Sequence, residues 1–388
     1  MSFTDRLGLS IPQAVLAWVL VVLIGGAAGL LAMLICNYML SFGGSDSASK
    51  HGISKVQATR LGGVAIVAYM IMHLGYQAYS GFYLPLIEEA LIMGACLAFF
   101  VIGVYEDLSG LLSARTRFSM MLIVGLLTMY FAPGLVLQPV GILWVDLIVG
   151  STPLVAGLFT AICVAFIPNA FNTADGANGL VAGVSACAFA ALTSVAPSEL
   201  VPFLLAALVG CLVFLVFNLV SGRFFLGDGG AYFLGALTGL SLVVIANTSD
   251  VSVWWLLSLV FYPVADLIWS MGPRIRRGVS PLNPDNQHFH NVLFAYLDAG
   301  EQSSVWANTI TGVSIAFVFA GLPLTLTATN ALAVDSNAWF FWVLGQWVLY
   351  VAGSKYLNDR LCVLPVATVR NVTTNPDLRK FIRSDIKL

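Results

Sequence analysis

Charged residues are scarce in this sequence. Asp, Glu, Lys and Arg make up 9% of the 388 residues, hydrophobic residues make up 59%, and the mean hydropathy is +0.92. Because soluble domains carry about 25% charged residues, this composition excludes a soluble globular protein and predicts a membrane protein. Pro and Gly are scattered through apolar runs, which excludes disordered and collagen-like chains. The six cysteines show no CxxC spacing and indicate neither a disulfide framework nor a zinc site.

We do not expect the N-terminal apolar run to be a cleavable signal peptide. The first apolar run is longer than the core of a signal peptide, and it follows Asp5 and Arg6 rather than a basic segment, so we expect it to remain as a membrane helix. Apolar runs bounded by charged or turn residues predict an all-α polytopic protein with about eleven membrane helices. These lie near residues 15–38, 61–78, 86–105, 118–132, 154–167, 180–195, 201–220, 231–246, 253–271, 305–327 and 338–352.

The apolar segment 135–150 is interpreted differently. Pro139, Gly141 and Asp146 interrupt it, so we expect a hairpin or re-entrant piece at the outer face rather than a span. With this assignment, 16 of the 17 Lys and Arg residues fall on one side of the membrane and only Arg6 falls on the other. The positive-inside rule then predicts an external N-terminus and a cytoplasmic C-terminus. We expect one membrane domain over residues 1–354 and a basic cytoplasmic tail over 355–388.

Polar residues gather on the loops assigned to the cytoplasm, so we expect the active site there. Asp107, Asp175 and Asp228 each begin or end an apolar helix, where an unpaired carboxylate is costly. Hard oxygen ligands beside glycine-rich turns suit Mg²⁺, with Mn²⁺ as an alternative, and arginines can clamp phosphate oxygens. This combination predicts phosphoryl transfer. The polar clusters are residues 59–63, 106–108 followed by Arg115 and Arg117, 169–180, 227–230, and 280–291 preceded by Arg274 and Arg277.

Each cluster also has a simpler interpretation. Residues 227–230 alone could be a tight turn, and the arginines alone could only fix the topology. His288 and His290 are spaced poorly for a metal on a helix, which favours hydrogen bonding to phosphate or sugar over zinc. Segment 169–180 is harder to dismiss, because three Asn, an Asp and two Gly stand between two apolar runs.

In order from about residue 60 to residue 291, these segments resemble the polyprenyl-phosphate N-acetylhexosamine-1-phosphate transferases, of glycosyltransferase family 4 type. Segments 169–180 and 225–230 are the most specific. The family's paired acids fall on Glu106 and Asp107, its NxxNxxDGxxGL motif on Asn169, Asn172, Asp175, Gly176, Gly179 and Leu180, its magnesium-binding GDxG aspartate on Asp228, its histidine loop on His288, His290 and Asn291, its Arg-Gly-Gly signature on Arg60, Gly62 and Gly63, and its following basic residue on Arg115 or Arg117.

The resemblance implies a role for each matched residue. Catalytic roles fall on Glu106, Asp107 and Asp175, and metal binding falls on Asp228 and Asp107. Asp107 is the acid–base candidate, although a lipid phosphate with a second pKa near ~6 is largely a dianion at pH 7 and needs no base. Substrate binding is expected from Arg60, Arg115, Arg117, Asn169, Asn172, Asn178, Arg274, Arg277, His288 and His290.

Two residues depart from the family pattern. Glu106 stands where Asp is usual, which keeps the charge and adds a methylene, and Asn291 stands at the third histidine. The missing histidine and the eleven predicted spans favour the N-acetylglucosamine-type branch over the muramoyl-pentapeptide branch.

The resemblance implies transfer of a sugar 1-phosphate from a UDP-N-acetyl-hexosamine to undecaprenyl phosphate at the bacterial inner membrane, with release of UMP, as a first membrane step of envelope glycan synthesis. A phospho-N-acetylmuramoyl-pentapeptide transferase and a membrane transporter are the alternatives. Transporter sites lie near the midplane between repeats, whereas these polar groups crowd one face. The oligomeric state stays open, a homodimer included, as does the choice between direct attack and an aspartyl-phosphate intermediate.

Overall fold

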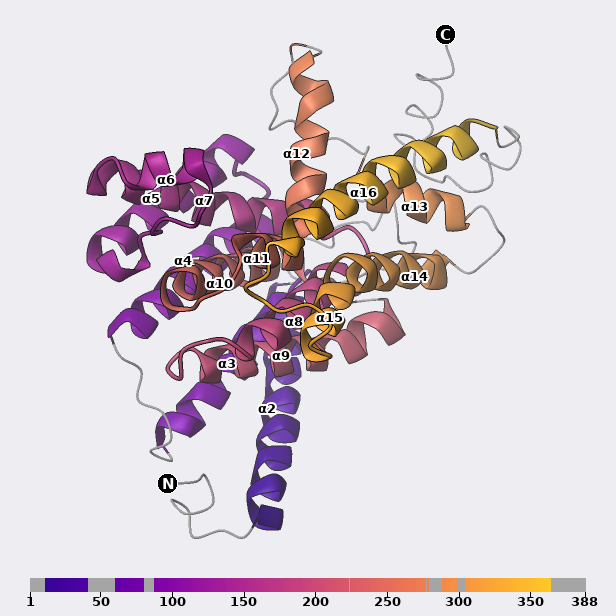
Figure 1. The fold of residues 1–388 in the computed structure, drawn as a ribbon. Helices are drawn as coiled ribbons and strands as arrows, with labels where there is room; N and C mark the ends of the chain where they lie inside the picture. The colour runs from indigo at the N-terminus through magenta and orange to yellow at the C-terminus, as the bar shows by residue number, and fades with distance from the viewer. Residues whose placement is uncertain are drawn as a thin grey trace.

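The computed structural model describes residues 11–40, 60–79, 87–222, 224–276, 278, 288–298 and 304–363. Within these ranges the regular elements are helices, with no strand (Figure 1). The helices are α2 (Ile11–Leu40), α3 (Gly62–Tyr79), α4 (Ile87–Ser109), α5 (Ala114–Phe131), η2 (Pro133–Leu135), α6 (Leu143–Val149), α7 (Pro153–Ala174), α8 (Leu180–Thr193), α9 (Val201–Ser221), α10 (Gly227–Thr248), α11 (Val253–Leu259), α12 (Phe261–Arg276), α13 (Phe289–Asp298), α14 (Ser304–Ala316), η3 (Phe317–Gly321), α15 (Leu322–Ala328) and α16 (Ala338–Val363).

Helix α10 is the centre of the bundle. It is buried along nearly its whole length and packs most extensively against α4 and α7, and also against α3 and α8. Glycines permit this close packing, because small residues let helix backbones approach each other in a membrane protein. A Cβ at Gly103 of α4 would lie 2.5 Å from backbone atoms of Asp228 and Gly229, and one at Gly235 would lie 2.6 Å from the Cα of Pro168 in α7.

Hydrogen bonds between loops define the two ends of the bundle. At one end, the N–H groups of Gly62 and Gly63 donate to the carbonyls of Phe225 and Leu226, each over 2.9 Å, which joins the start of α3 to the start of α10. The C-terminal end of α4 lies at this end as well, because Asp107 accepts the N–H groups of Asp228 and Gly229. Asp175, just after α7, lies beside Gly227 and Asp228, and α9 ends shortly before α10 begins. At the other end, Asn247 accepts the Gln138 N–H over 2.9 Å. The polar clusters around Asp107, Asp175 and Asp228 therefore share one end.

The chain is a multi-pass membrane protein. Five helices are long and apolar enough to cross a bilayer, and a sixth span is formed if α11 and α12, bent by 80°, count together. The five are α4, α7, residues 201–220 of α9, α10, and residues 305–328 of the continuous α14–η3–α15 helix. The other predicted segments fall on α2, α3, α5, α8 and α16, so the count of eleven and the orientation stay predictions.

Segment 135–150 is too short to cross the membrane as a helix. It contains only the end of η2 and the seven-residue α6, whereas a span needs about 20 residues. The side chain of Asp146, one of the residues that interrupt the apolar segment, accepts the N–H groups of Val140 and Gly141 over 2.7 and 3.1 Å. The segment is therefore a compact hairpin held by its own carboxylate.

The contact between α4 and α10 gives a matched stability test. Gly103→Ala should lower the free energy of unfolding by about 1–3 kcal/mol, because the added methyl meets the α10 backbone rather than a movable side chain. Gly94→Ala, on the same helix, is the control, because a Cβ there has nothing within 4 Å. Thermal unfolding in detergent compares the two. Equal stability of both variants would contradict the backbone contact.

Candidate active site

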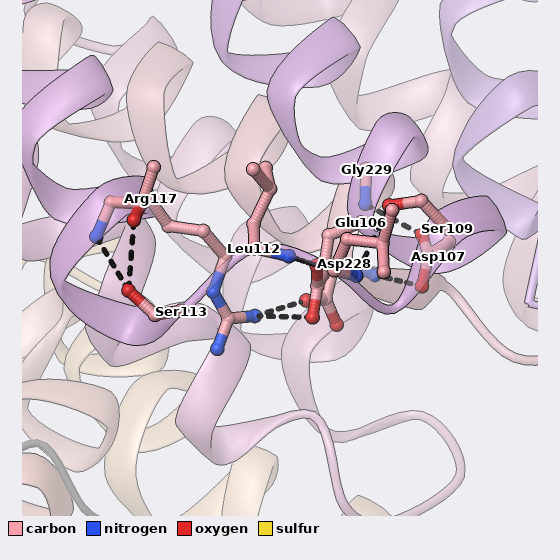
Figure 2. Close-up of polar contacts among 10 residues, drawn as sticks. Glu106, Asp107, Ser109, Leu112, Ser113, Arg117, Asp228 and Gly229 are labelled. Carbon is pink, nitrogen blue, oxygen red and sulfur yellow. Dashed lines mark hydrogen bonds and ion pairs between the residues drawn. The ribbon is translucent and has the colours of Figure 1, made fainter.

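Asp107, near the C-terminal end of α4, caps the N-terminus of α10. Its Oδ1 accepts the Asp228 N–H over 3.1 Å and its Oδ2 accepts the Gly229 N–H over 3.0 Å (Figure 2). The first N–H groups of a helix have no partner inside the helix. Leu226, at the N-cap position of α10, has no side chain able to accept them. A carboxylate from a neighbouring helix therefore supplies the cap.

Gly227 lets this cap form. Its φ is +76°, a left-handed conformation that favours glycine. A Cβ there would overlap the carbonyl oxygen of Arg60 and lie 2.8 Å from Asp107 Oδ2. The glycine in the sequence GDGG is therefore required by both backbone conformation and close approach. Residues 227–230 thus form the first turn of α10 rather than an isolated tight turn, and their role in binding a metal stays a prediction.

Arg117 joins Asp228 to Glu106. Its Nη1 lies 2.7 Å from Asp228 Oδ2 and 3.9 Å from Glu106 Oε1 (Figure 2). Glu106 also accepts the Leu112 N–H over 2.8 Å, which holds the loop between α4 and α5. Ser113 caps the start of α5 by accepting the Thr116 N–H over 3.1 Å. Arg117 therefore extends from a fixed helix start, whereas Arg115 is exposed on the same turn.

Asp175 completes a cluster of three aspartates. It occupies the C-cap position of α7, just beyond the apolar helix. Desolvation and the negative charges of Asp228 and Asp107 raise the pKa of Asp175 to about 8, against the opposing effects of the Gly227 N–H and Arg60. The structure thus brings together Asp107, Asp175, Asp228, Glu106, Arg60 and Arg117.

The histidine segment contacts this cluster through Gly176. The ring of His290, on α13, lies so close to Gly176 that a Cβ there would overlap its Nε2. Burial lowers the pKa of His290 to about 4, so the ring is neutral at pH 7. His288 lies beside it, and the two rings are parallel, with centroids 5.6 Å apart.

The predicted asparagines make contacts within the protein. Asn169 Nδ2 donates to the Ala165 carbonyl over 2.8 Å and lies 3.1 Å from the sulfur of Met121. Asn178 is buried, and its backbone N–H donates to Asn308 Oδ1 of α14 over 2.6 Å. Asn172 accepts the Asp175 N–H through its backbone carbonyl over 3.2 Å. Roles of these residues in substrate binding stay predictions.

The roles predicted for Arg274 and Arg277 in substrate binding stay predictions. Arg274 is buried on α12, and Arg277 lies outside the described residues. Among the described residues, no group of three or more His, Cys, Asp or Glu side chains converges as a preformed metal site.

Three residues that the sequence interpretation missed support the histidines. Asp266 and Tyr262, on α12, contact His288 and His290, and Tyr350, on α16, donates to Asp266 over 2.8 Å. One signal was available, because an aspartate inside the apolar run 253–271 marks a functional position by default.

Comparison with known proteins finds a family match in this part of the chain. Residues 89–246 match the model of glycosyl transferase family 4, a range that contains the acidic pair, segment 169–180 and Asp228. Arg60 and the two histidines lie outside it.

The chain is 28% identical over 250 residues to undecaprenyl-phosphate alpha-N-acetylglucosaminyl 1-phosphate transferase of Escherichia coli K12, over 60% of this chain and 64% of that protein. It is 27% identical over 308 residues to the protein of that name in Salmonella typhimurium, over 75% of each chain. It is 29% identical over 277 residues to phospho-N-acetylmuramoyl-pentapeptide-transferase of Deinococcus radiodurans, over 66% of this chain and 85% of that protein. The resemblance predicted from the sequence is confirmed: residues 89–246 match the glycosyl transferase family 4 model.

Proposed function

We propose that this protein transfers a sugar 1-phosphate, N-acetylglucosamine 1-phosphate in particular, from a UDP-sugar to undecaprenyl phosphate and releases UMP. The observation that carries the proposal is the cluster of Asp107, Asp175 and Asp228, with Arg117 paired to it, at one end of an apolar helix bundle. Relatives named for this reaction support the choice of substrates.

The location of the cluster suits a lipid acceptor. A polyprenyl phosphate keeps its chain in the bilayer and its phosphate at the membrane surface, where the ends of α4, α7 and α10 meet. We further propose that this end faces the cytoplasm of a bacterial inner membrane, where UDP-sugars are made. The bias of basic residues supports this orientation. The proposal includes eleven spans and an external N-terminus.

The aspartates fit a magnesium ion, or Mn²⁺. Mg²⁺ is usually held by one or two carboxylates and completed by phosphate oxygens and water, so a preformed site of three side chains is not needed. Asp228 would hold it, with Asp107 as a second ligand, since a carboxylate offers about four acceptor positions and Asp107 uses two for backbone N–H groups. When bound, the ion would offset the repulsion between carboxylates and diphosphate.

Arg117 is suited to binding phosphate. One of its nitrogens pairs with Asp228, while its Nε is buried without a hydrogen-bond partner among the described residues. A buried donor without a partner is costly, and a phosphate oxygen would satisfy it. We propose that Arg117 and Arg60 bind the donor diphosphate beside Asp228.

The proposed reaction is a direct phosphoryl transfer. An oxygen of the lipid phosphate attacks the β-phosphorus of the UDP-sugar, and the bond from that phosphorus to the bridging oxygen breaks. UMP leaves with the bridging oxygen and the electron pair. Because the acceptor is largely a dianion at pH 7, Asp107 positions reactants and no proton has to be removed. His290, neutral at this pH, can donate a hydrogen bond to the developing charge.

One second activity is favoured by a specific finding. The Deinococcus radiodurans relative, matched over 85% of its length, is named for transfer of phospho-N-acetylmuramoyl-pentapeptide. Purified protein can be offered undecaprenyl phosphate with labelled UDP-N-acetylglucosamine or with labelled UDP-N-acetylmuramoyl-pentapeptide. The donor that is converted discriminates between the two activities.

Asp228→Asn should abolish turnover while the protein stays folded in detergent, because the change removes the charge that pairs with Arg117 and would hold the ion. The matched control is Asp335→Asn, an exposed aspartate beyond α15 that contacts none of the cluster. EDTA should stop the wild-type reaction and Mg²⁺ or Mn²⁺ should restore it. Wild-type rates in Asp228→Asn, or turnover unaffected by EDTA, would contradict the metal-assisted mechanism.

The nucleotide product identifies the bond that breaks. Attack at the β-phosphorus leaves the sugar C1–O bond intact, so the nucleotide released should be UMP and the sugar should keep its anomeric configuration. Chromatography of the nucleotides after incubation with a UDP-N-acetyl-hexosamine and undecaprenyl phosphate measures this. Release of UDP would show glycosyl transfer and refute the proposal.

Topology is tested separately. Reporter fusions at Leu388 and within the segment after Arg274 should both give cytoplasmic signals, because the basic residues of the chain concentrate on that side. A fusion before the first helix should report an external location. An external signal at Leu388 would overturn the count of spans and the shared cytoplasmic site.

A further inference from the structure

Two residues of α12, four positions apart, hold the two histidines. Asp266 Oδ2 lies 2.8 Å from His288 Nδ1, and the Tyr262 hydroxyl lies 3.0 Å from His290 Nδ1. The Tyr262 hydroxyl also accepts the His290 N–H over 3.2 Å. Because positions i and i+4 share a helix face, one face of α12 contacts both rings.

Asp266 is the most enclosed residue of this group. It is fully buried, and its two oxygens accept from three donors: His288 Nδ1, the Phe289 N–H over 3.0 Å and the Tyr350 hydroxyl over 2.8 Å. Burying a carboxylate is costly unless charge and hydrogen bonds compensate it. The donors come from the start of α13 and from α16, so Asp266 joins three helices.

The contact with Asp266 determines the tautomer and favours the charged form of His288. A carboxylate accepts hydrogen bonds, so Nδ1 carries the proton, and a charged His288 gains the most from this partner. His288 would then contact a ligand through Nε2. Its ring is parallel to that of His290, which lies against Gly176 beside Asp175.

We propose that Asp266 is a positioning residue for the transfer reaction: it fixes the ring of His288 and stabilises its imidazolium form, so that His288 binds the diphosphate of the UDP-sugar. This inference rests on the proposed function and extends it to a residue in an apolar helix. The arrangement follows the general logic of a carboxylate that orients a histidine and stabilises its charged form.

The test is a double-mutant cycle with purified full-length protein. Asp266→Asn can still accept from Phe289 and Tyr350 but loses the charge next to His288, so kcat should fall about 10²-fold. His288→Gln should give a similar loss. If Asp266 acts through His288, the double variant should be no slower than His288→Gln alone. Asp335→Asn, exposed and remote, is the matched carboxylate control and should keep the wild-type kcat.

Tyr350→Phe provides a second route should Asp266→Asn fail to fold. It keeps the carboxylate and removes one donor to it, so it should give a smaller loss of about fivefold, absent when His288 is already Gln. Additive losses in either cycle, or wild-type kcat in His288→Gln, would overturn the positioning role alone. A wild-type protein that transfers no sugar phosphate from any UDP-N-acetyl-hexosamine would overturn the proposed function and this inference together.

Discussion

The hydrogen bonds from the start of α10 to Asp107 are the interaction on which the bundle and the candidate site both depend. α10 begins at one end of the bundle with buried glycines, Gly227, Gly229 and Gly230. An unsatisfied backbone group in such surroundings costs several kcal/mol. Asp107 removes this cost for two N–H groups, and in doing so places its carboxylate beside Asp228. The residue that completes the central helix is therefore also part of the acidic cluster.

Close backbone packing concentrates negative charge at this end of the bundle. Because Gly103 and Gly227 have no Cβ, the backbone of α10 can lie directly against α4 and against the carbonyl of Arg60. The approach brings three aspartates into one electrostatic neighbourhood, and the charges of Asp228 and Asp107 add to the effect of burial in raising the pKa of Asp175 to about 8. Arg60 and Arg117 offset only part of this repulsion. In the proposed function, a cation would offset the rest of this repulsion when the phosphate groups of the substrates arrive.

The sequence predicted the helical class and the convergence of the acidic clusters, because alternating apolar runs force Asp107, Asp175 and Asp228 to the same end. It did not predict how individual polar side chains are used. Asn178 donates to Asn308, some 130 residues away, and no local pattern indicates that partner. The partners of Asp266 could not be predicted either, because its three donors come from the start of α13 and from α16, which are distant in the sequence. The number of spans is uncertain from hydropathy alone, because helices such as α5 and α16 combine apolar and charged residues.

The candidate site has two halves that different helices hold. The carboxylates belong to α4, α7 and α10, which pack tightly through glycines, whereas the histidines are held by α12 and α16. The contact of His290 with Gly176 joins the halves. In the proposed function the acidic half would hold the cation, and the histidine half would supply hydrogen-bond donors. A diphosphate carries charge along its length, so it is the kind of group that both halves could bind at once. Helix α12 follows α11 at a bend of 80°, and its Tyr262 and Asp266 contact His290 and His288.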